Sequence, residues 1–389
     1  MDTVRILSVD DESDLELLLT QYFRRKIRKG EYEFSFAHNG LEALEMLLKH
    51  KNFDIILSDI NMPEMDGLTL LTKINEMQNP ALKCIMVSAY GDMGNIRQAM
   101  NNGAFDFATK PIDLDDLSVT IEKAIAQIAY IKRMEMEHKQ LEGIKDDLAV
   151  ASQIQLSILP RIFPPFPDCT DKLDIAASMH AAKDVGGDFY DFFRIDDDHI
   201  GFVMADVSGK GIPAAIFMAV SRTVIRTTAI QGMSPGACIA RSNTLIAKES
   251  SNGMFVTVFY GIYNVKTGEI TYCNAGHNSP FILKENGKVE KLPMSTNLIV
   301  GIMEGFEFEE GRCQLEQGDT LFTYTDGVSE AMDVNLKMFG EDRMKASLAK
   351  MPHHTCQQII DTMKGDVADF TIGAEQSDDI TMLALKRLS

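Results

Sequence analysis

The residues of this chain best suited to chemistry are aspartates that end short apolar runs. Asp59 closes one such run, and the segment after it contains Pro63 and Gly67, which break the strand into a loop. Asp10 and Asp11 close an earlier run. A carboxylate at the carboxyl edge of a buried parallel strand can act as a nucleophile toward phosphate when a cation offsets its charge. Paired acids beside it supply the oxygen ligands that Mg²⁺ prefers.

Two further strand ends carry polar groups of the same kind. Ser88 ends the run that begins at Ile85, and Lys110 ends the run that begins at Phe107. A hydroxyl and an ammonium group can each contact a phosphoryl oxygen. These elements, in this order along the first 111 residues, resemble the receiver domain of bacterial two-component response regulators. The alternative is a nucleotide-binding sheet with acids at its edge.

The resemblance to receiver domains implies a role for each residue of this set. Asp59 is the phosphoacceptor, and a sensor histidine kinase or phosphotransfer protein is its phosphoryl donor. Ser88 and Lys110 contact the phosphoryl group, and Phe107 is an aromatic switch. The implied Mg²⁺ ligands are Asp10, Asp11, Asp59 and the backbone carbonyl of Asn61.

Length and composition narrow the remaining function. A chain of 389 residues is long enough for two or three domains. The net charge of −19 argues against broad contact with nucleic acid or an anionic membrane. There is no basic helix-turn-helix signature, so a DNA-binding output is not expected. The six cysteines form no CxxC pair, which favours reduced thiols. No signal peptide and no apolar run of about 20 residues is visible, so we expect a cytoplasmic protein.

The hydrophobic period changes after about residue 122. Up to that point, short apolar runs alternate with helical patterns, as in a doubly wound α/β domain. Apolar residues then recur at spacings of 3 and 4, which is a coiled-coil signal and predicts a parallel dimer. A single amphipathic helix packed on its own domains is the alternative. The expected seam comprises Leu114, Leu117, Ile121, Ala124, Ile128, Ile131, Leu141, Ile144, Leu148 and Ala151.

A proline-rich segment beginning at Pro160 ends that helix. Beyond it, period-2 strands and long helical patterns predict an α+β layered β-sandwich. We therefore expect a receiver domain over residues 1–122, a helical coiled-coil linker over 123–160 and a third domain over 161–389.

The third domain contains acids where strands meet Gly- or Ser-rich turns. They are Asp188, Asp206, Asp326 and the pair Asp378 and Asp379. Carboxylates on convergent strand ends suit Mg²⁺ or Mn²⁺. Two such ions can acidify a bridging water and direct it at phosphorus. A single Asp-Gly is usually a plain turn, but the joint occurrence of these motifs predicts a metal-dependent site.

The order of these motifs resembles the metal-dependent 2C-type (PPM) serine/threonine phosphatases of the bacterial sporulation and stress-response branch. The resemblance implies two Mn²⁺ or Mg²⁺ ions. It implies that Asp206 bridges them, that the Val207 carbonyl supports one, that Asp326 and Asp378 bind the other, and that Asp188 holds a metal or its water. Asp379 ranks below Asp378 as a ligand.

The group that anchors the substrate phosphate has no clear match. Lys183, Lys210 and His277 are candidates, and His277 is as well explained by a structural turn.

Two functions compete for the third domain. The first is a phosphoserine/phosphothreonine phosphatase, controlled by Asp59 phosphorylation, whose substrate in this branch is an anti-sigma-factor antagonist. The second is a phosphorylation-gated adaptor with an inactive phosphatase fold. A diguanylate cyclase is a weaker alternative, because Phe189 follows Asp188 where that signature needs a glutamate.

Overall fold

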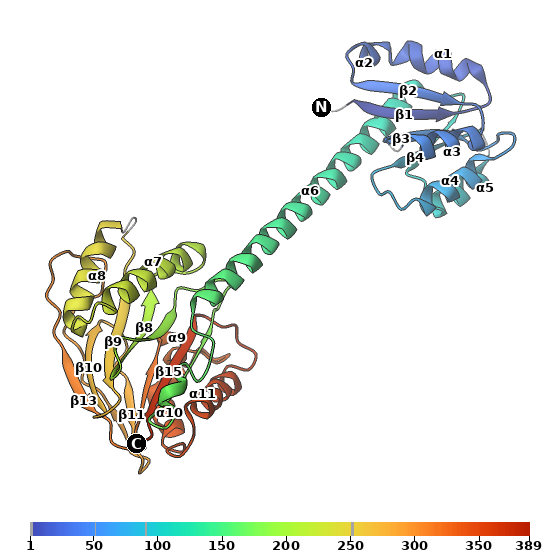
Figure 1. The fold of residues 1–389 in the computed structure, drawn as a ribbon. Coiled ribbons are helices and arrows are strands. Elements are labelled where there is room, and N and C mark those ends of the chain that lie inside the picture. The colour runs from blue at the N-terminus through green and yellow to red at the C-terminus, as the bar shows by residue number, and fades with distance from the viewer. Residues whose placement is uncertain (1–2, 51, 90–91, 250–252) are drawn as a thin grey trace. The chain divides into compact units, whose positions relative to one another are not determined.

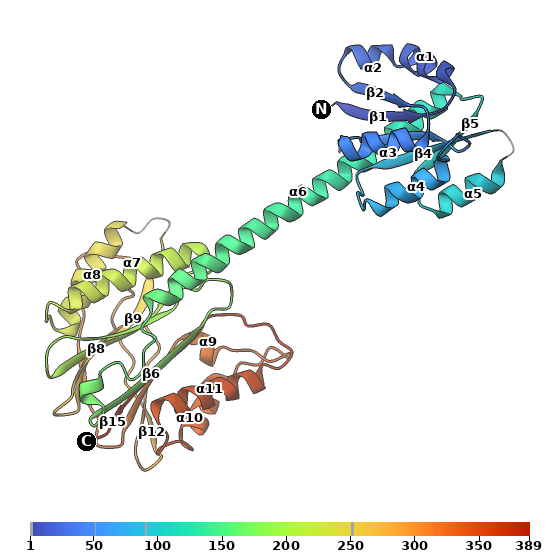
Figure 2. The same ribbon diagram turned by 45° about the vertical axis from the view of Figure 1, so that its right-hand side comes forward.

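The structure is a computed structural model that describes residues 3–50, 52–89, 92–249 and 253–389. The chain falls into two compact units, residues 1–144 and 145–389 (Figures 1 and 2). Within the described residues, no helix combines the length and the apolar character that crossing a bilayer requires.

The first unit is a doubly wound α/β domain, as the sequence predicts. Its five parallel strands run in the order β2-β1-β3-β4-β5. The strands are β1 (Val4–Val9), β2 (Tyr32–Ala37), β3 (Ile55–Asp59), β4 (Lys83–Ala89) and β5 (Asp106–Lys110). The helices between them are α1 (Ser13–Tyr22), α2 (Arg24–Arg28), α3 (Gly40–Lys49), α4 (Gly67–Glu76) and α5 (Met93–Asn101). One core cluster packs α3, α4 and α5 on one face of the sheet, and a second packs α1 and the following helix on the other.

That following helix, α6 (Leu114–Ile158), continues from the first unit into the second. The first turns of this helix contradict part of the seam prediction. Leu117, Ile121 and Ala124 are at most 1% exposed and belong to the core of the first unit. This part of the pattern is therefore the buried face of the last helix of the α/β domain. Farther along, Leu141 and Ile144 are 59% and 56% exposed. Only this later part of the seam is free to pair with another helix.

The second unit is built on two antiparallel five-stranded sheets, β13-β10-β9-β8-β7 and β12-β11-β14-β15-β6. The first sheet comprises β7 (Phe189–Arg194), β8 (His199–Val207), β9 (Val256–Asn264), β10 (Glu269–Ala275) and β13 (Gly311–Gln314). The second comprises β6 (Leu173–His180), β11 (Phe281–Leu283), β12 (Val289–Lys291), β14 (Thr320–Tyr324) and β15 (Ile380–Arg387). A short 3₁₀ turn, η1 (Pro167–Cys169), precedes β6.

Strand residues of the second sheet alternate between two cores. Leu321 and Leu383 join the cluster shared with the first sheet, whereas Phe322 and Met382 join the cluster beneath the helices. This period of two with both faces buried makes the unit a layered β-sandwich, which confirms the predicted fold class. The covering helices are α7 (Ile212–Ala229) and α8 (Pro235–Glu249) on the first sheet, and α10 (Gly340–Leu348) and α11 (Cys356–Phe370) on the second (Figure 2). The short helix α9 (Asp326–Ser329) follows β14.

Candidate functional sites

The acids of the first unit converge where its strand order reverses. β1 lies between β2 and β3, so the carboxyl ends of β1 and β3 flank the crevice in which such sheets bind ligands. Lys110 reaches this edge from the end of β5. Its Nζ lies 2.7 Å from Asp59 Oδ2 and 2.9 Å from Asp10 Oδ2. The structure therefore brings these three predicted residues into direct contact.

This cluster carries more negative than positive charge. Ligand oxygens of Asp10, Asp11 and Asp59 lie within 4.8 Å of one another. Burial raises the pKa of Asp10 although Lys110 opposes the shift. For Lys110, burial alone would lower the pKa, but the hydrogen bonds to Asp59 and Asp10 raise it. One ammonium facing three carboxylates leaves a charge deficit that a divalent cation fits.

The remaining predicted residues surround Asp59. The Asn61 N–H points at Asp59 Oδ1 over 3.4 Å. Ser88 is fully buried, and no hydrogen-bond partner for its Oγ is found among the described residues. A buried hydroxyl without a hydrogen-bond partner costs free energy, so a group that accepts a hydrogen bond from Ser88 fits this position. Phe107 is 36% exposed. Gly67 is required here because a Cβ would lie 2.0 Å from the Asp59 carbonyl oxygen.

The acids of the second unit come from both of its sheets. The β7–β8 register pairs Phe189 with Ala205, and one step further it places Asp188 opposite Asp206. On the other sheet, Asp326 follows β14, while Asp378 and Asp379 precede its partner β15. The two pairs of strand ends meet at one end of the sandwich.

The pKa shifts indicate that these carboxylates lie close enough to repel one another. Burial, and then Asp206, raise the pKa of Asp188 well above its usual range. Burial, and then Asp326, raise the pKa of Asp206 to about 7. Burial, and then Asp378, raise the pKa of Asp326. Buried carboxylates that oppose each other's ionisation lack a counter-charge, which hard divalent cations would supply.

In the part of the chain that the structure describes, three carboxylates come within 4.8 Å of one another at the Asp59 cluster, and the acids of the sandwich do not form such a compact group. They form a looser acidic cluster, which comprises Asp188, Asp206, Asp326 and Asp378. The Val207 carbonyl lies against the loop that carries Asp188, because a Cβ on Gly187 would lie 3.0 Å from it.

Asp379 has a role that the sequence did not reveal. Its Oδ1 accepts the Ala182 N–H at 2.8 Å, and its Oδ2 accepts the Gly187 N–H at 2.6 Å. A Cβ on Gly186 would lie 2.3 Å from the same carboxylate, so glycine permits this approach. Asp379 thus ties the start of β15 to the loop that carries Asp188.

Two further residues hold Asp188 in place. Thr325 Oγ1 donates to Asp188 Oδ2 at 2.6 Å. Behind the loop, Gln155 of α6 makes two reciprocal bonds with Gly186: Nε2 donates to its carbonyl at 2.5 Å, and Oε1 accepts its N–H at 3.0 Å. Nothing in the sequence signals this contact between residues 31 positions apart.

The candidates for anchoring phosphate differ sharply in environment. Lys210 Nζ lies 2.7 Å from Asp378 Oδ2, so its ammonium already neutralises part of the negative charge of the acidic cluster. Burial lowers the pKa of His277 to about 4, which leaves the imidazole neutral. The Asn274 side chain makes two hydrogen bonds with the backbone of His277, as in a structural turn. Lys183 is exposed.

Comparisons with known proteins agree with both halves of this description. Residues 6–122 match the response regulator receiver domain, and residues 196–388 match stage II sporulation protein E (SpoIIE). Protein IcfG of Synechocystis sp. is 31% identical over 62% of this chain, which spans 41% of IcfG. The phosphoserine phosphatase RsbU of Bacillus subtilis is 28% identical over 64% of this chain and 74% of its own length.

The fold of the second unit is also found in a solved structure. The SiaA-PP2C domain of Pseudomonas aeruginosa aligns with 64% of this chain and 98% of its own, with a TM-score of 0.56 and 20% identity. The chain therefore joins an N-terminal response regulator receiver domain to a C-terminal phosphatase domain of the SpoIIE branch of the PP2C family.

Proposed function

We propose that this protein is a metal-dependent phosphoserine/phosphothreonine protein phosphatase whose activity is controlled by phosphorylation of Asp59. The observation that carries the proposal is the meeting of Asp188, Asp206, Asp326 and Asp378 from two sheets, with pKa values raised at the first three. An inactive adaptor would be under no constraint to keep every one of these acids.

In the receiver, Asp59 is the nucleophile toward the phosphoryl donor, a sensor histidine kinase or phosphotransfer protein. Asp10, Asp11, Asp59 and the Asn61 carbonyl would hold Mg²⁺, which neutralises the charge that the phosphoryl group brings. Lys110 stays charged beside the incoming oxygens. The Ser88 hydroxyl, which has no partner in the described structure, would donate to a phosphoryl oxygen and leave room for Phe107 to turn inward.

In the phosphatase domain, Asp206 lies between the acids of the two sheets and is the residue suited to bridging. Asp188, Asp326, Asp378 and the Val207 carbonyl would complete the ligands of two Mn²⁺ or Mg²⁺ ions. Such ions, when bound, lower the pKa of a water and offset charge at phosphorus. Thr325 and Asp379 both orient the Asp188 loop, and Lys210 offsets charge at Asp378.

The route between the two sites is helix α6. Its first turns are part of the receiver core, and Gln155 near its end holds the loop of Asp188. The exposed residues Leu141 and Ile144 continue at heptad spacing to Leu148, which supports a parallel homodimer along this stretch. A change at the receiver that alters helix pairing would then reach the metal site through Gln155.

The substrate class follows from the family resemblance. We assign it as a phosphorylated anti-sigma-factor antagonist type protein, a small phosphoserine or phosphothreonine domain. RsbU, a similar protein, is a phosphoserine phosphatase. The alternative, a phosphorylation-gated adaptor, predicts no hydrolysis.

Hydrolysis of p-nitrophenyl phosphate with Mn²⁺ separates the two functions. Asp206→Ala should lower the rate by on the order of 10²-fold or more, because several kcal/mol of charge stabilisation are lost. Asp197→Ala, an exposed aspartate in the β7–β8 turn, is the matched control and should retain the wild-type rate. Equal background rates in the wild type and Asp206→Ala would establish the adaptor.

A further inference from the structure

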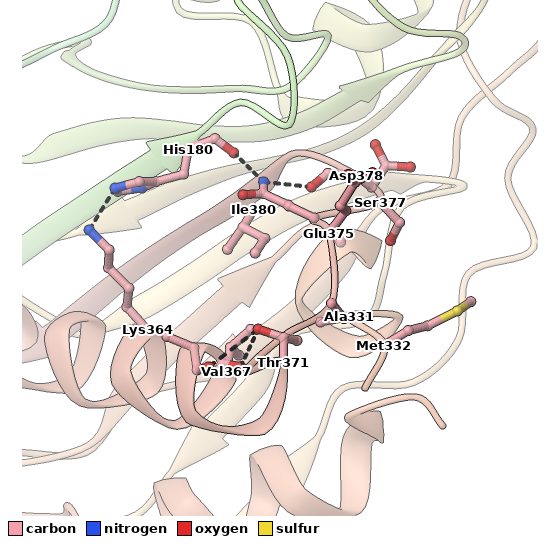
Figure 3. A pocket seen from close by; sticks show the side chains of 14 residues that line it. His180, Ala331, Met332, Lys364, Val367, Thr371, Glu375, Ser377, Asp378 and Ile380 are labelled. Atoms are coloured by element: carbon pink, nitrogen blue, oxygen red, sulfur yellow. Dashed lines mark hydrogen bonds between the residues drawn. The ribbon is translucent and has the colours of Figure 1, made fainter. Parts of the chain in front are cut away.

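A pocket beside α11 adjoins the acidic cluster of the phosphatase domain. It has a volume of about 170 Å³ and is lined by Asp378 of that cluster and by Gly327, which follows Asp326. Figure 3 shows Glu375, Ser377 and Asp378 together along one side of the pocket, and this segment is the wall that the pocket shares with the acidic cluster through Asp378. The Gln376 side-chain amide holds this segment in place. It donates to the His180 carbonyl at 3.0 Å and to the Asp378 carbonyl at 2.7 Å.

The interior of the pocket is apolar and small. Ala331, Val367 and Ile380 line it, and the first two are at most 5% exposed. Ligand pockets for whole small molecules are usually about 300–1,000 Å³. A cavity near 150 Å³ with apolar walls accommodates a group the size of benzene. The pocket therefore has the size of one apolar side chain.

One end of the pocket is polar and basic. Lys364 Nζ lies 2.6 Å from His180 Nε2 (Figure 3), and this is the partner found for Lys364 among the described residues. Burial, and then Lys364, lower the pKa of His180, so the ring is neutral and accepts the bond. The ammonium retains N–H groups that can donate to a carbonyl or carboxylate of a bound chain.

Exposed apolar side chains occur in the chain segments next to the lining residues Met332 and Thr371. Val334 and Ile372 are 63% and 74% exposed, and a Cβ on Gly373 would lie 3.4 Å from Val334. Exposed apolar residues gathered beside a candidate active site are typical of a protein-binding surface. They favour a polypeptide over a free phosphate ester as the ligand.

We infer that this pocket is a substrate subsite that receives one apolar side chain flanking the phosphorylated residue, while Lys364 binds an oxygen of the same segment. The inference rests on the proposed phosphatase function. A phosphoserine whose phosphate lies at Asp378 has its neighbouring residues within reach of the pocket, because the two share a wall. The subsite would add selectivity among phosphoproteins without taking part in the chemistry.

The test uses the full chain with Mn²⁺ and phosphoserine peptides in which one leucine is moved through the positions flanking the phosphoserine. Leucine at one position should raise kcat/KM about tenfold over alanine, the order expected for filling an apolar pocket. Ala368→Trp fills the pocket from an exposed position on α11 and should abolish this preference. Thr362→Trp, exposed on the same helix outside the pocket, should preserve it.

Lys364→Met is the second variant, since it leaves the apolar interior unchanged. It should lower peptide kcat/KM severalfold and leave p-nitrophenyl phosphate turnover within twofold of the wild type. Turnover of p-nitrophenyl phosphate with no leucine preference, or a preference that persists in Ala368→Trp, would overturn the subsite alone. Failure of the wild type to hydrolyse either substrate would overturn the proposed function and the subsite with it.

Discussion

Replacing Gln155 with alanine should weaken metal binding by the phosphatase domain without touching any carboxylate. Gln155 is 6% exposed, and both atoms of its amide are engaged by the Gly186 backbone. Gly186 in turn precedes Gly187 and Asp188, which Asp379 and Thr325 hold from the other side. Removing the amide leaves one buried N–H and one buried carbonyl without partners.

The size of the effect follows from those two groups. A buried polar group that loses its partner costs about 1–3 kcal/mol, so the loop as seen in the structure becomes about 2–6 kcal/mol less favourable. Water and local rearrangement will recover part of this. If about 1.4–2.8 kcal/mol of this cost remains, metal binding has to offset it when the loop is ordered. The half-saturating Mn²⁺ concentration then rises about 10- to 100-fold.

Two measurements check this prediction. Isothermal titration calorimetry gives the Mn²⁺ affinity directly, and p-nitrophenyl phosphate turnover against Mn²⁺ concentration gives the half-saturation point. The rate at saturating Mn²⁺ should stay within about twofold of the wild type, because the ligands are unchanged. Ser157→Ala is the control: Ser157 is exposed, and the one partner of its hydroxyl among the described residues is the Ile154 carbonyl of the same helix. Unchanged Mn²⁺ affinity in Gln155→Ala would refute the positioning role.

Three further substitutions probe the linker, the metal loop and the buried histidine. Leu117→Asp should unfold the receiver in a circular dichroism melt, whereas Leu141→Asp should only weaken dimerisation in analytical ultracentrifugation; equal effects of the two would contradict the division of α6. Gly327→Ala should destabilise the phosphatase domain by about 1–3 kcal/mol in urea, because its Cβ would lie 2.0 Å from the Asp379 carbonyl, while Gly365→Ala, with open space around it, should not. His277 has an ordinary pKa of 6.5 when unfolded and about 4 when folded, so its contribution to stability falls as the pH drops from 6.5 to 4. The stability difference between the wild type and His277→Gln should therefore shrink across that window, and a constant difference would contradict the buried neutral state.

Much of the receiver site could be predicted from the sequence because its signals are local. Each functional residue ends an apolar run, and the parallel sheet gathers all such ends at one edge. Lys110 and Asp59 are far apart in the chain, but each is marked by its own strand. The acids of the sandwich were predictable for the same reason, since Asp206 is the penultimate residue of β8 and Asp326 comes two residues after β14.

The contacts that orient those acids were not predictable. Gln155 and Asp379 act on the Asp188 loop from positions 31 and more than 190 residues away, and their partners are backbone groups that leave no sequence pattern. The prediction that the whole α6 seam pairs with a second helix was wrong for a different reason. A heptad pattern shows that a helix face is buried, but it does not show what buries it. The receiver sheet covers Leu117 and Ile121, and only the later turns remain exposed.

The central claim, that the receiver controls the phosphatase, is tested most directly by one comparison of rates. Hydrolysis of a phosphoserine peptide with Mn²⁺ is measured with and without beryllofluoride, a phosphoryl mimic that binds the receiver aspartate, at a concentration where the chain is dimeric. We predict that the mimic raises the rate severalfold in the wild type and has no effect in Asp59→Asn. An equal wild-type rate with and without the mimic would contradict control through Asp59 and α6.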